Sequence, residues 1–246
     1  MHPNPNREVR KRKMSANRET RRATAPEDHA ISVPAARLSI AAAAVALLSL
    51  ASLHMLSPEF DPTWRVVSEY ANGQYGWVLS LMFVAWGISS WALAFAIRAQ
   101  LKTTAGKLGL GFLVAAGLGQ AMASACDINH PLHGVAGMLG VLGLPIAAML
   151  ISVVLGRIQA WSSAKTLLLW TGNSTWVILI VMIAALMVMI AGRTRAGTIA
   201  LVGYPNRLLV VLDCVWTMTV AWQAIKLRHP ATQVPQAMRG PRPELQ

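Results

Sequence analysis

Charged residues are scarce in this sequence. Only 13% of its 246 residues are Asp, Glu, Lys or Arg, whereas a soluble domain carries roughly 25%. Hydrophobic residues make up 54% of the chain, and its apolar runs reach the about 20 residues that cross a bilayer core. The composition excludes an ordinary soluble domain and predicts an all-α, polytopic membrane helical bundle.

Cysteines and recognisable catalytic motifs are also scarce. Cys126 and Cys214 are the only cysteines, which excludes a disulfide framework. The sequence has no Walker loop, Rossmann fingerprint, HExxH or GxSxG motif, and no paired histidines on both membrane sides for a haem. We therefore expect no cofactor. The net charge of +12 is concentrated in the tails, and we expect no nucleic-acid partner.

Six apolar runs predict six transmembrane helices within a domain spanning residues 35–228. The predicted helices cover residues 38–56, 77–97, 108–125, 135–155, 167–190 and 208–225. Residues 1–34 hold eight Lys or Arg and residues 229–246 are Pro-rich and polar, so both segments are predicted to be disordered cytoplasmic tails. The first helix could instead be the apolar region of a cleaved signal peptide. Its nearly full span after a long basic region favours an uncleaved anchor.

The distribution of basic residues predicts the orientation. Eighteen of the 22 Lys and Arg residues fall in the two tails, in the loops after the second and fourth helices, or at the adjoining helix ends. The opposite side has only Arg65, Arg193, Arg195 and Arg207. Because basic residues stay cytoplasmic, both termini are predicted to be cytoplasmic, in a multi-pass protein of the cell inner (plasma) membrane.

The most polar stretch within the hydrophobic part of the chain is residues 56–77, on the predicted outer side. Its motifs Asp61-Pro62, Ser68-Glu69-Tyr70 and Gly76-Trp77, with Leu132-His133-Gly134 and the segment 203–207, resemble the domain of unknown function 998 family. The resemblance covers roughly residues 36–228. It implies a bacterial protein of about six spans and brings no established reaction. The motif residues that it carries over are Asp61, Ser68, Glu69, Tyr70, His133 and Arg207.

A metal site is one candidate for chemistry. Cys126, Asp127, His130 and His133 are four potential ligands at short spacing. Their spacing matches no established zinc signature, so Asp127, His130 and His133 remain weak candidates. In the alternative interpretation Asp127 and Asn129 cap the fourth helix.

Asp213 is a second candidate. It is predicted about five residues inside the last helix, roughly 8 Å below the outer interface. A carboxylate at that depth needs a partner or a water-filled cavity. It is either a proton or ligand site or a structural, hydrogen-bonded carboxylate.

The third candidate is an outer cluster of Asp61, Glu69, His133 and Arg207. We expect the first outer loop to lie across the mouths of the fourth and sixth helices, with Glu69 paired to Arg207. Such a cluster could perform acid–base chemistry or bind an anionic headgroup. It could equally be a salt-bridged lid.

Small residues predict helix contacts. Glycines at positions 134, 137, 140 and 143 and at 109, 111, 117 and 119 indicate a tight hairpin of the third and fourth helices. Gly137 and Gly140 are predicted to lie against a neighbouring helix.

The leading functional hypothesis is a non-enzymatic membrane module, surrounded by membrane lipids, that binds a lipid or small ligand at the outer cluster. A hydrolase or transferase using His133 with Asp61 and Glu69 is the runner-up. The third hypothesis is a proton-coupled transporter around Asp213. The oligomeric state stays open.

Overall fold

The computed structural model describes residues 31–192 and 201–228, which belong to one compact unit. The predicted tails, apart from residues 31–34, and Arg193 and Arg195 lie outside the described residues. The described part contains helices and loops and no strands. Six of its helical segments are long and apolar enough to cross a membrane. The prediction of a six-span membrane bundle is confirmed.

The helices follow one another in the chain with short connections. The long ones are α2 (Val33–Leu56), α3 (Gly76–Ile97), α4 (Thr104–Ala125), α6 (Gly143–Leu155), α7 (Lys165–Gly192) and α8 (Gly203–Arg228). The fourth span is interrupted and consists of α5 (His133–Gly137), the π-helix η3 (Met138–Leu142) and α6. Three 3-10 helices, η1 (Val67–Asn72), η2 (Arg98–Gln100) and η4 (Gln159–Ala164), lie in the connections.

Local sequence explains where several helices begin and bend. Pro34 stands in the first turn of α2, where its missing N–H costs nothing. Thr103 caps α4, because its side chain accepts a hydrogen bond from the Gly106 N–H at 3.1 Å. Pro145, the third residue of α6, has no N–H for the carbonyl four residues earlier, which belongs to the π-helix.

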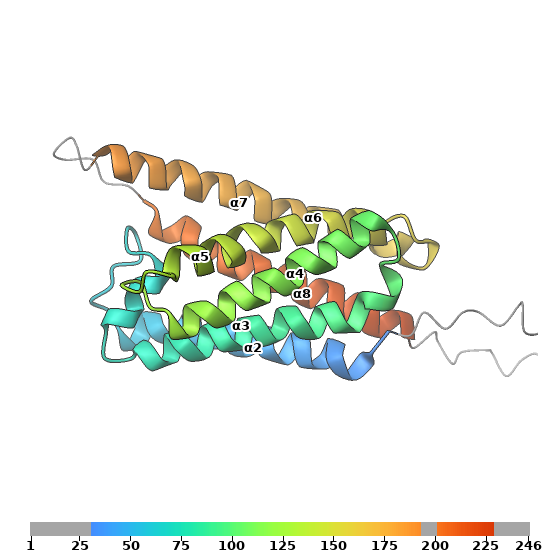
Figure 1. Ribbon diagram of the computed structural model, residues 1–246, viewed down its shortest axis with the longest axis horizontal. Helices are drawn as coiled ribbons and strands as arrows, with labels where there is room; N and C mark the ends of the chain where they lie inside the picture. The colour runs from blue at the N-terminus through green and yellow to red at the C-terminus, as the bar shows by residue number, and fades with distance from the viewer. Residues whose placement is uncertain (1–30, 193–200, 229–246) are drawn as a thin grey trace, which may run out of the picture. The chain divides into compact units, whose positions relative to one another are not determined.

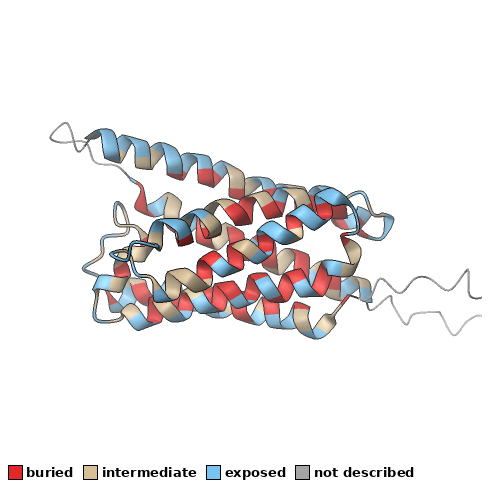
Figure 2. Cartoon of the chain, in the orientation of Figure 1, coloured by how far each residue is buried: buried red, intermediate tan, exposed pale blue. Residues whose placement is uncertain are grey.

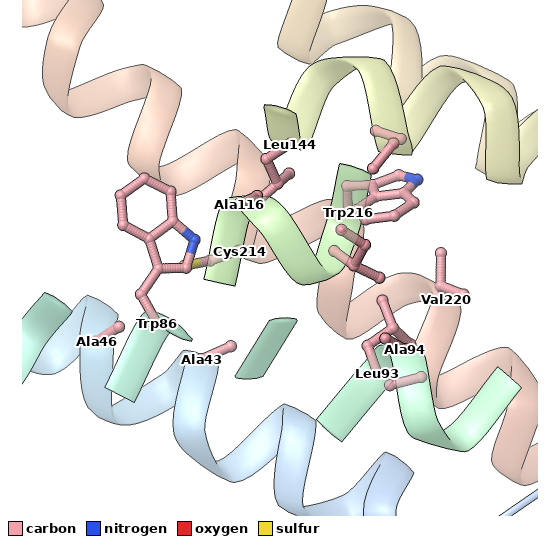
Figure 3. Packing of buried hydrophobic residues seen from close by; sticks show 14 of the residues in the cluster. Ala43, Ala46, Trp86, Leu93, Ala94, Ala116, Leu144, Cys214, Trp216 and Val220 are labelled. Atoms are coloured by element: carbon pink, nitrogen blue, oxygen red, sulfur yellow. The ribbon is translucent and has the colours of Figure 1, made fainter. Parts of the chain in front are cut away.

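The helices form a closed ring. Each long helix packs against the next one in the chain, and α8 returns to pack against both α7 and α2. Side chains of α2, α3, α4, α6 and α8 meet in the core that Figure 3 shows, where Trp86 and Trp216 are the largest labelled groups. Helix α7 is the most exposed span (Figure 2), and only 22% of the residues in its most apolar 18-residue stretch are buried.

The bundle has two distinct ends. Residues 57–75, which we call the cap, and residues 126–132 lie at one end, which we call the loop end (Figure 1). Helix α2 begins and helix α8 finishes at the opposite end. This arrangement places the candidate residues of the cap beside the start of α8.

The predicted glycine contacts are partly wrong. A Cβ atom at Gly137 would meet nothing within 4 Å, so this residue does not lie against a helix. Gly140 does, since a Cβ there would lie 3.6 Å from the Gln120 side chain. Among the described glycines of α4 and the fourth span, Gly119 makes the tightest contact between the two, since a Cβ there would lie 2.5 Å from the Gly140 nitrogen. The two spans pack against each other as the predicted hairpin does.

Candidate functional site

The cap is built from local turns. The Asp61 carboxylate accepts a hydrogen bond from the Thr63 N–H at 2.9 Å, which closes a turn that contains Pro62. This hydrogen bond holds the pKa of the exposed Asp61 carboxyl below its usual value. Asp61 therefore shapes the cap, and its carboxylate has no hydrogen bond to His133 or Arg207 in the described part of the chain.

Arg207 attaches the cap to α8. Its Nη1 donates to the backbone carbonyls of Arg65 at 2.6 Å, Gly203 at 3.1 Å and Pro62 at 3.4 Å. Its Nη2 donates to the Tyr70 hydroxyl at 3.0 Å, and its Nε donates to His54 Nε2 at 2.8 Å. The side chain is buried, with 7% of the residue exposed. One guanidinium thus joins α2, the cap and α8.

The predicted ion pair between Glu69 and Arg207 is wrong. Glu69 binds Arg65, which lies four residues earlier, and also accepts a hydrogen bond from the Val66 N–H at 3.2 Å. This is the one ion pair among the described residues. Arg65 lies only four residues from Glu69, so the local pair forms. Arg207 donates to backbone carbonyls instead.

Further hydrogen bonds hold the cap in place. The Gly203 N–H, at the start of α8, donates to the Thr63 carbonyl at 3.0 Å. The Val67 N–H donates to Asn206 Oδ1 at 2.7 Å. On the other side of the cap, Asn129 Nδ2 donates to Asn72 Oδ1 at 2.9 Å. The cap is therefore bound to the start of α8 and to the loop before α5.

A pocket of about 90 Å³ lies beneath η1 and between α3, α4, the fourth span and α8. Most of its lining is apolar, and its polar side chains are Ser68, Gln120, His133 and Asn206. Two of the candidate residues, Ser68 and His133, thus line the same pocket. Mostly apolar walls with a few polar groups are typical of ligand sites.

The polar groups of the pocket differ in what they already bind. His133 Nδ1 donates to the Cys126 carbonyl at 2.8 Å, which leaves Nε2 without a hydrogen-bond partner in the described ranges. The Ser68 hydroxyl makes no hydrogen bond to another described residue. Asn206 uses its Oδ1 for the cap. Ser68 and His133 can therefore offer hydrogen bonds to a ligand.

Gln120 forms the polar floor of the pocket. In the amide orientation that satisfies all partners, Oε1 accepts from the Trp86 indole at 3.2 Å and Nε2 donates to the Ser90 hydroxyl at 2.9 Å. Gln120 is buried, with 2% exposed. The network fixes the amide between α3 and α4.

The candidate metal ligands bind backbone groups. Asp127 accepts from the Asn129 N–H at 2.9 Å, and His130 Nδ1 accepts from the Leu132 N–H at 3.1 Å. Within residues 31–192 and 201–228, no three His, Cys, Asp or Glu side chains lie close enough to hold a metal ion. The helix-capping interpretation is wrong, because Leu132 occupies the N-cap of α5. Nor do the hydrogen bonds of His133, Asp61 and Glu69 assemble a catalytic set.

Asp213 lies deeper than predicted. Because α8 begins at Gly203, Asp213 is about 15 Å along the helix from its start. It is 0% exposed, and neither carboxylate oxygen has a hydrogen-bond partner. It follows Leu209 and Val210 by one turn on the same face of α8, and those two residues line the pocket. Asp213 therefore lies one turn below the pocket.

Some residues of this region escaped sequence reasoning. His54 accepts a hydrogen bond from Arg207 and its ring contacts Tyr70 of the cap. Asn206 accepts a hydrogen bond from Val67 of the cap, and Phe83 and Trp86 line the pocket. The signal for Asn206 was its position beside the motif residue Arg207. The others are ordinary residues of apolar helices and carry no distinguishing pattern.

Comparison with protein families identifies the family of the chain. Residues 40–223 match the family described as Protein of unknown function (DUF998). The chain belongs to this family. The predicted family membership is confirmed, and with it a multi-pass membrane protein. No curated protein and no solved structure matches the chain. In this DUF998 protein, five of the six residues singled out by the sequence resemblance lie in the cap or line the pocket: Asp61, Ser68, Glu69, Tyr70 and His133. The sixth, Arg207, binds the cap from α8.

Proposed function

We propose that this DUF998 protein is a non-enzymatic membrane module that binds a compact polar ligand in the pocket beneath the cap. The observation that carries the proposal is the pairing of two unused groups, the Ser68 hydroxyl and His133 Nε2, in one mostly apolar pocket. Both residues are partly exposed, so these two groups are accessible to a ligand. A ligand with one donor and one acceptor can bind both of them.

The size of the pocket restricts the ligand. Its volume of about 90 Å³ holds several waters, since one water needs roughly 10–15 Å³ on this measure. Drug-sized ligands occupy pockets of about 300–1,000 Å³. The ligand is therefore a molecule of few heavy atoms or the end of a longer one.

The proposal also includes an orientation. The bias of basic residues toward the tails and toward the connections at residues 98–107 and 156–165 supports a cytoplasmic position for the end of the bundle opposite the cap. The pocket then opens on the extracytoplasmic side of the inner membrane, and its ligand comes from there.

A pocket-filling variant tests ligand binding. Gly137 lines the pocket and its Cβ position is open, so Gly137→Leu should fill the pocket without displacing a helix. Gly111 on α4 is equally open and lies outside the pocket, which makes Gly111→Leu the matched control. We expect mass spectrometry to detect a small molecule that co-purifies with the wild-type and Gly111→Leu proteins and is lost, at least tenfold, from Gly137→Leu. The same co-purifying molecules in all three proteins would refute the pocket as the site.

Proton-coupled transport is the second candidate, and the unpartnered carboxyl of Asp213 below the pocket favours it. Intramembrane acids of this kind are commonly proton sites. In proteoliposomes with an imposed pH gradient, Asp213→Asn should abolish accumulation of the co-purifying molecule but leave its binding intact. Asp61→Asn, which removes an exposed carboxylate of the cap, is the control and should accumulate it normally. Accumulation by Asp213→Asn at the wild-type level would exclude this candidate.

A further inference from the structure

A second, larger cavity lies on the outside of the ring, between α2 and α8. Its volume is about 770 Å³. Leu47 and Leu50 of α2 and Val211 of α8 form its apolar part. His54, Tyr204 and Arg207 lie nearer the loop end and form a polar part. The groove therefore changes from apolar to polar toward the loop end. A lipid in one leaflet changes in the same direction, from its acyl chains to its headgroup.

The polar end of this groove carries a positive charge that no carboxylate contacts directly, although the exposed Asp61 carboxylate of the cap interacts with it electrostatically. Arg207 is 7% exposed and has no carboxylate partner, since the one ion pair among the described residues joins Arg65 and Glu69. A buried charge is costly unless it is paired. Arg207 lies in the second turn of α8, and the positive end of the helix dipole adds to its charge.

Arg207 also has a remaining donor. A guanidinium has five N–H groups. In the described part of the chain Nη2 makes one hydrogen bond, to Tyr70, so its second N–H has no acceptor. The Tyr204 side chain, 53% exposed, lines the same end of the groove and makes no hydrogen bond to a described residue. Two donors are thus available for the oxygens of an anion.

We infer that the groove between α2 and α8 binds an anionic phospholipid of the surrounding bilayer. One acyl chain lies along Leu47, Leu50 and Val211, and the phosphate binds at Arg207 and Tyr204. The lipid phosphate supplies the directly contacting negative charge that Arg207 lacks among the described residues. This site is separate from the pocket beneath the cap and does not depend on the function proposed for that pocket.

Replacing Arg207 is not a clean test of the lipid site, because Arg207 also holds the cap and its loss would destabilise the cap. The site is therefore tested with variants that fill the groove. Ala51 is exposed and lines the groove, so Ala51→Phe should fill it, as should Leu208→Trp from the α8 side. Ala41, also exposed on α2 but outside the groove, gives the control Ala41→Phe. Purified proteins in detergent receive phosphatidylglycerol, phosphatidylcholine with the same chains, or glycerol phosphate, and Tm is measured.

We expect phosphatidylglycerol to raise the Tm of the wild-type and Ala41→Phe proteins by about 2–4 °C more than phosphatidylcholine does. Both groove-filling variants should lose this difference while keeping a cooperative transition. Equal shifts with the two lipids would overturn the inference and leave only general solvation by lipid. An equal effect of glycerol phosphate would overturn it in favour of a free-phosphate site. If one groove variant does not fold, the other one serves as the test. An undiminished Tm difference between the two lipids in that variant also refutes the site.

Discussion

Replacing Arg207 by glutamine is expected to destabilise the protein by at least about 3 kcal/mol. The change removes donors from the carbonyls of Pro62, Arg65 and Gly203 and from Tyr70, which is fully buried. Each buried acceptor left without a donor costs about 1–3 kcal/mol. Several are lost at once, and the shorter glutamine side chain cannot replace them all.

Two measurements check this expectation. Thermal unfolding in detergent reports the global loss, and hydrogen exchange of residues 57–75 reports whether the cap separates first from α8. Arg65→Gln is the control, because Arg65 forms a half-exposed ion pair with Glu69, and such pairs contribute about 0–1 kcal/mol. If Arg207→Gln lost no more stability than Arg65→Gln, the hydrogen bonds of Arg207 would not hold the cap.

The partners of Arg207 show why this site could not be predicted in full. Opposite charge favoured Glu69 as its partner, and the sequence marks that residue clearly. The actual acceptors are mostly backbone carbonyls, which every residue has and no sequence pattern distinguishes. Arg65, only four residues from Glu69, forms the local pair at a lower entropic cost.

The spans themselves were predictable because each apolar run is long and bounded by polar residues. The boundaries were less so. Helix α8 begins at Gly203, five residues before the predicted start at Leu208. The segment Tyr204–Arg207 is polar and contains a proline, which suggested a loop. Its first turn is helical because the cap supplies partners for the backbone and for Arg207.

The glycines of the fourth span show why only some of the predicted glycine contacts form. A spacing of three residues turns about 300° around a helix, so successive glycines at positions 134, 137, 140 and 143 drift across its surface. They cannot all meet one neighbour. Gly140 and Gly143 face α4, whereas Gly134 and Gly137 face open space. The sequence predicts that the hairpin is close, but the rotation of the helix decides which glycine makes the contact.

Gly119→Ala is the second substitution with a large expected effect. An alanine Cβ would lie 2.5 Å from the Gly140 nitrogen and 2.6 Å from the Ala136 carbonyl oxygen. Both are backbone atoms, so no side chain can rotate away and the helices must separate. Overpacking of this kind costs about 1–3 kcal/mol, even though alanine is intrinsically favoured over glycine in a helix by about 1 kcal/mol.

Gly111→Ala separates the contact from helix propensity. Gly111 lies on the same helix, and its Cβ position has nothing within 4 Å. This variant should therefore keep or raise the Tm of thermal unfolding in detergent, whereas Gly119→Ala should lower it by about 2–10 °C. Because Gly119 lines the pocket beneath the cap, the separation of the helices should also weaken retention of the co-purifying molecule. Equal Tm values for the two variants would mean that α4 and the fourth span move apart at little cost, and that the pocket is not held in shape by this contact.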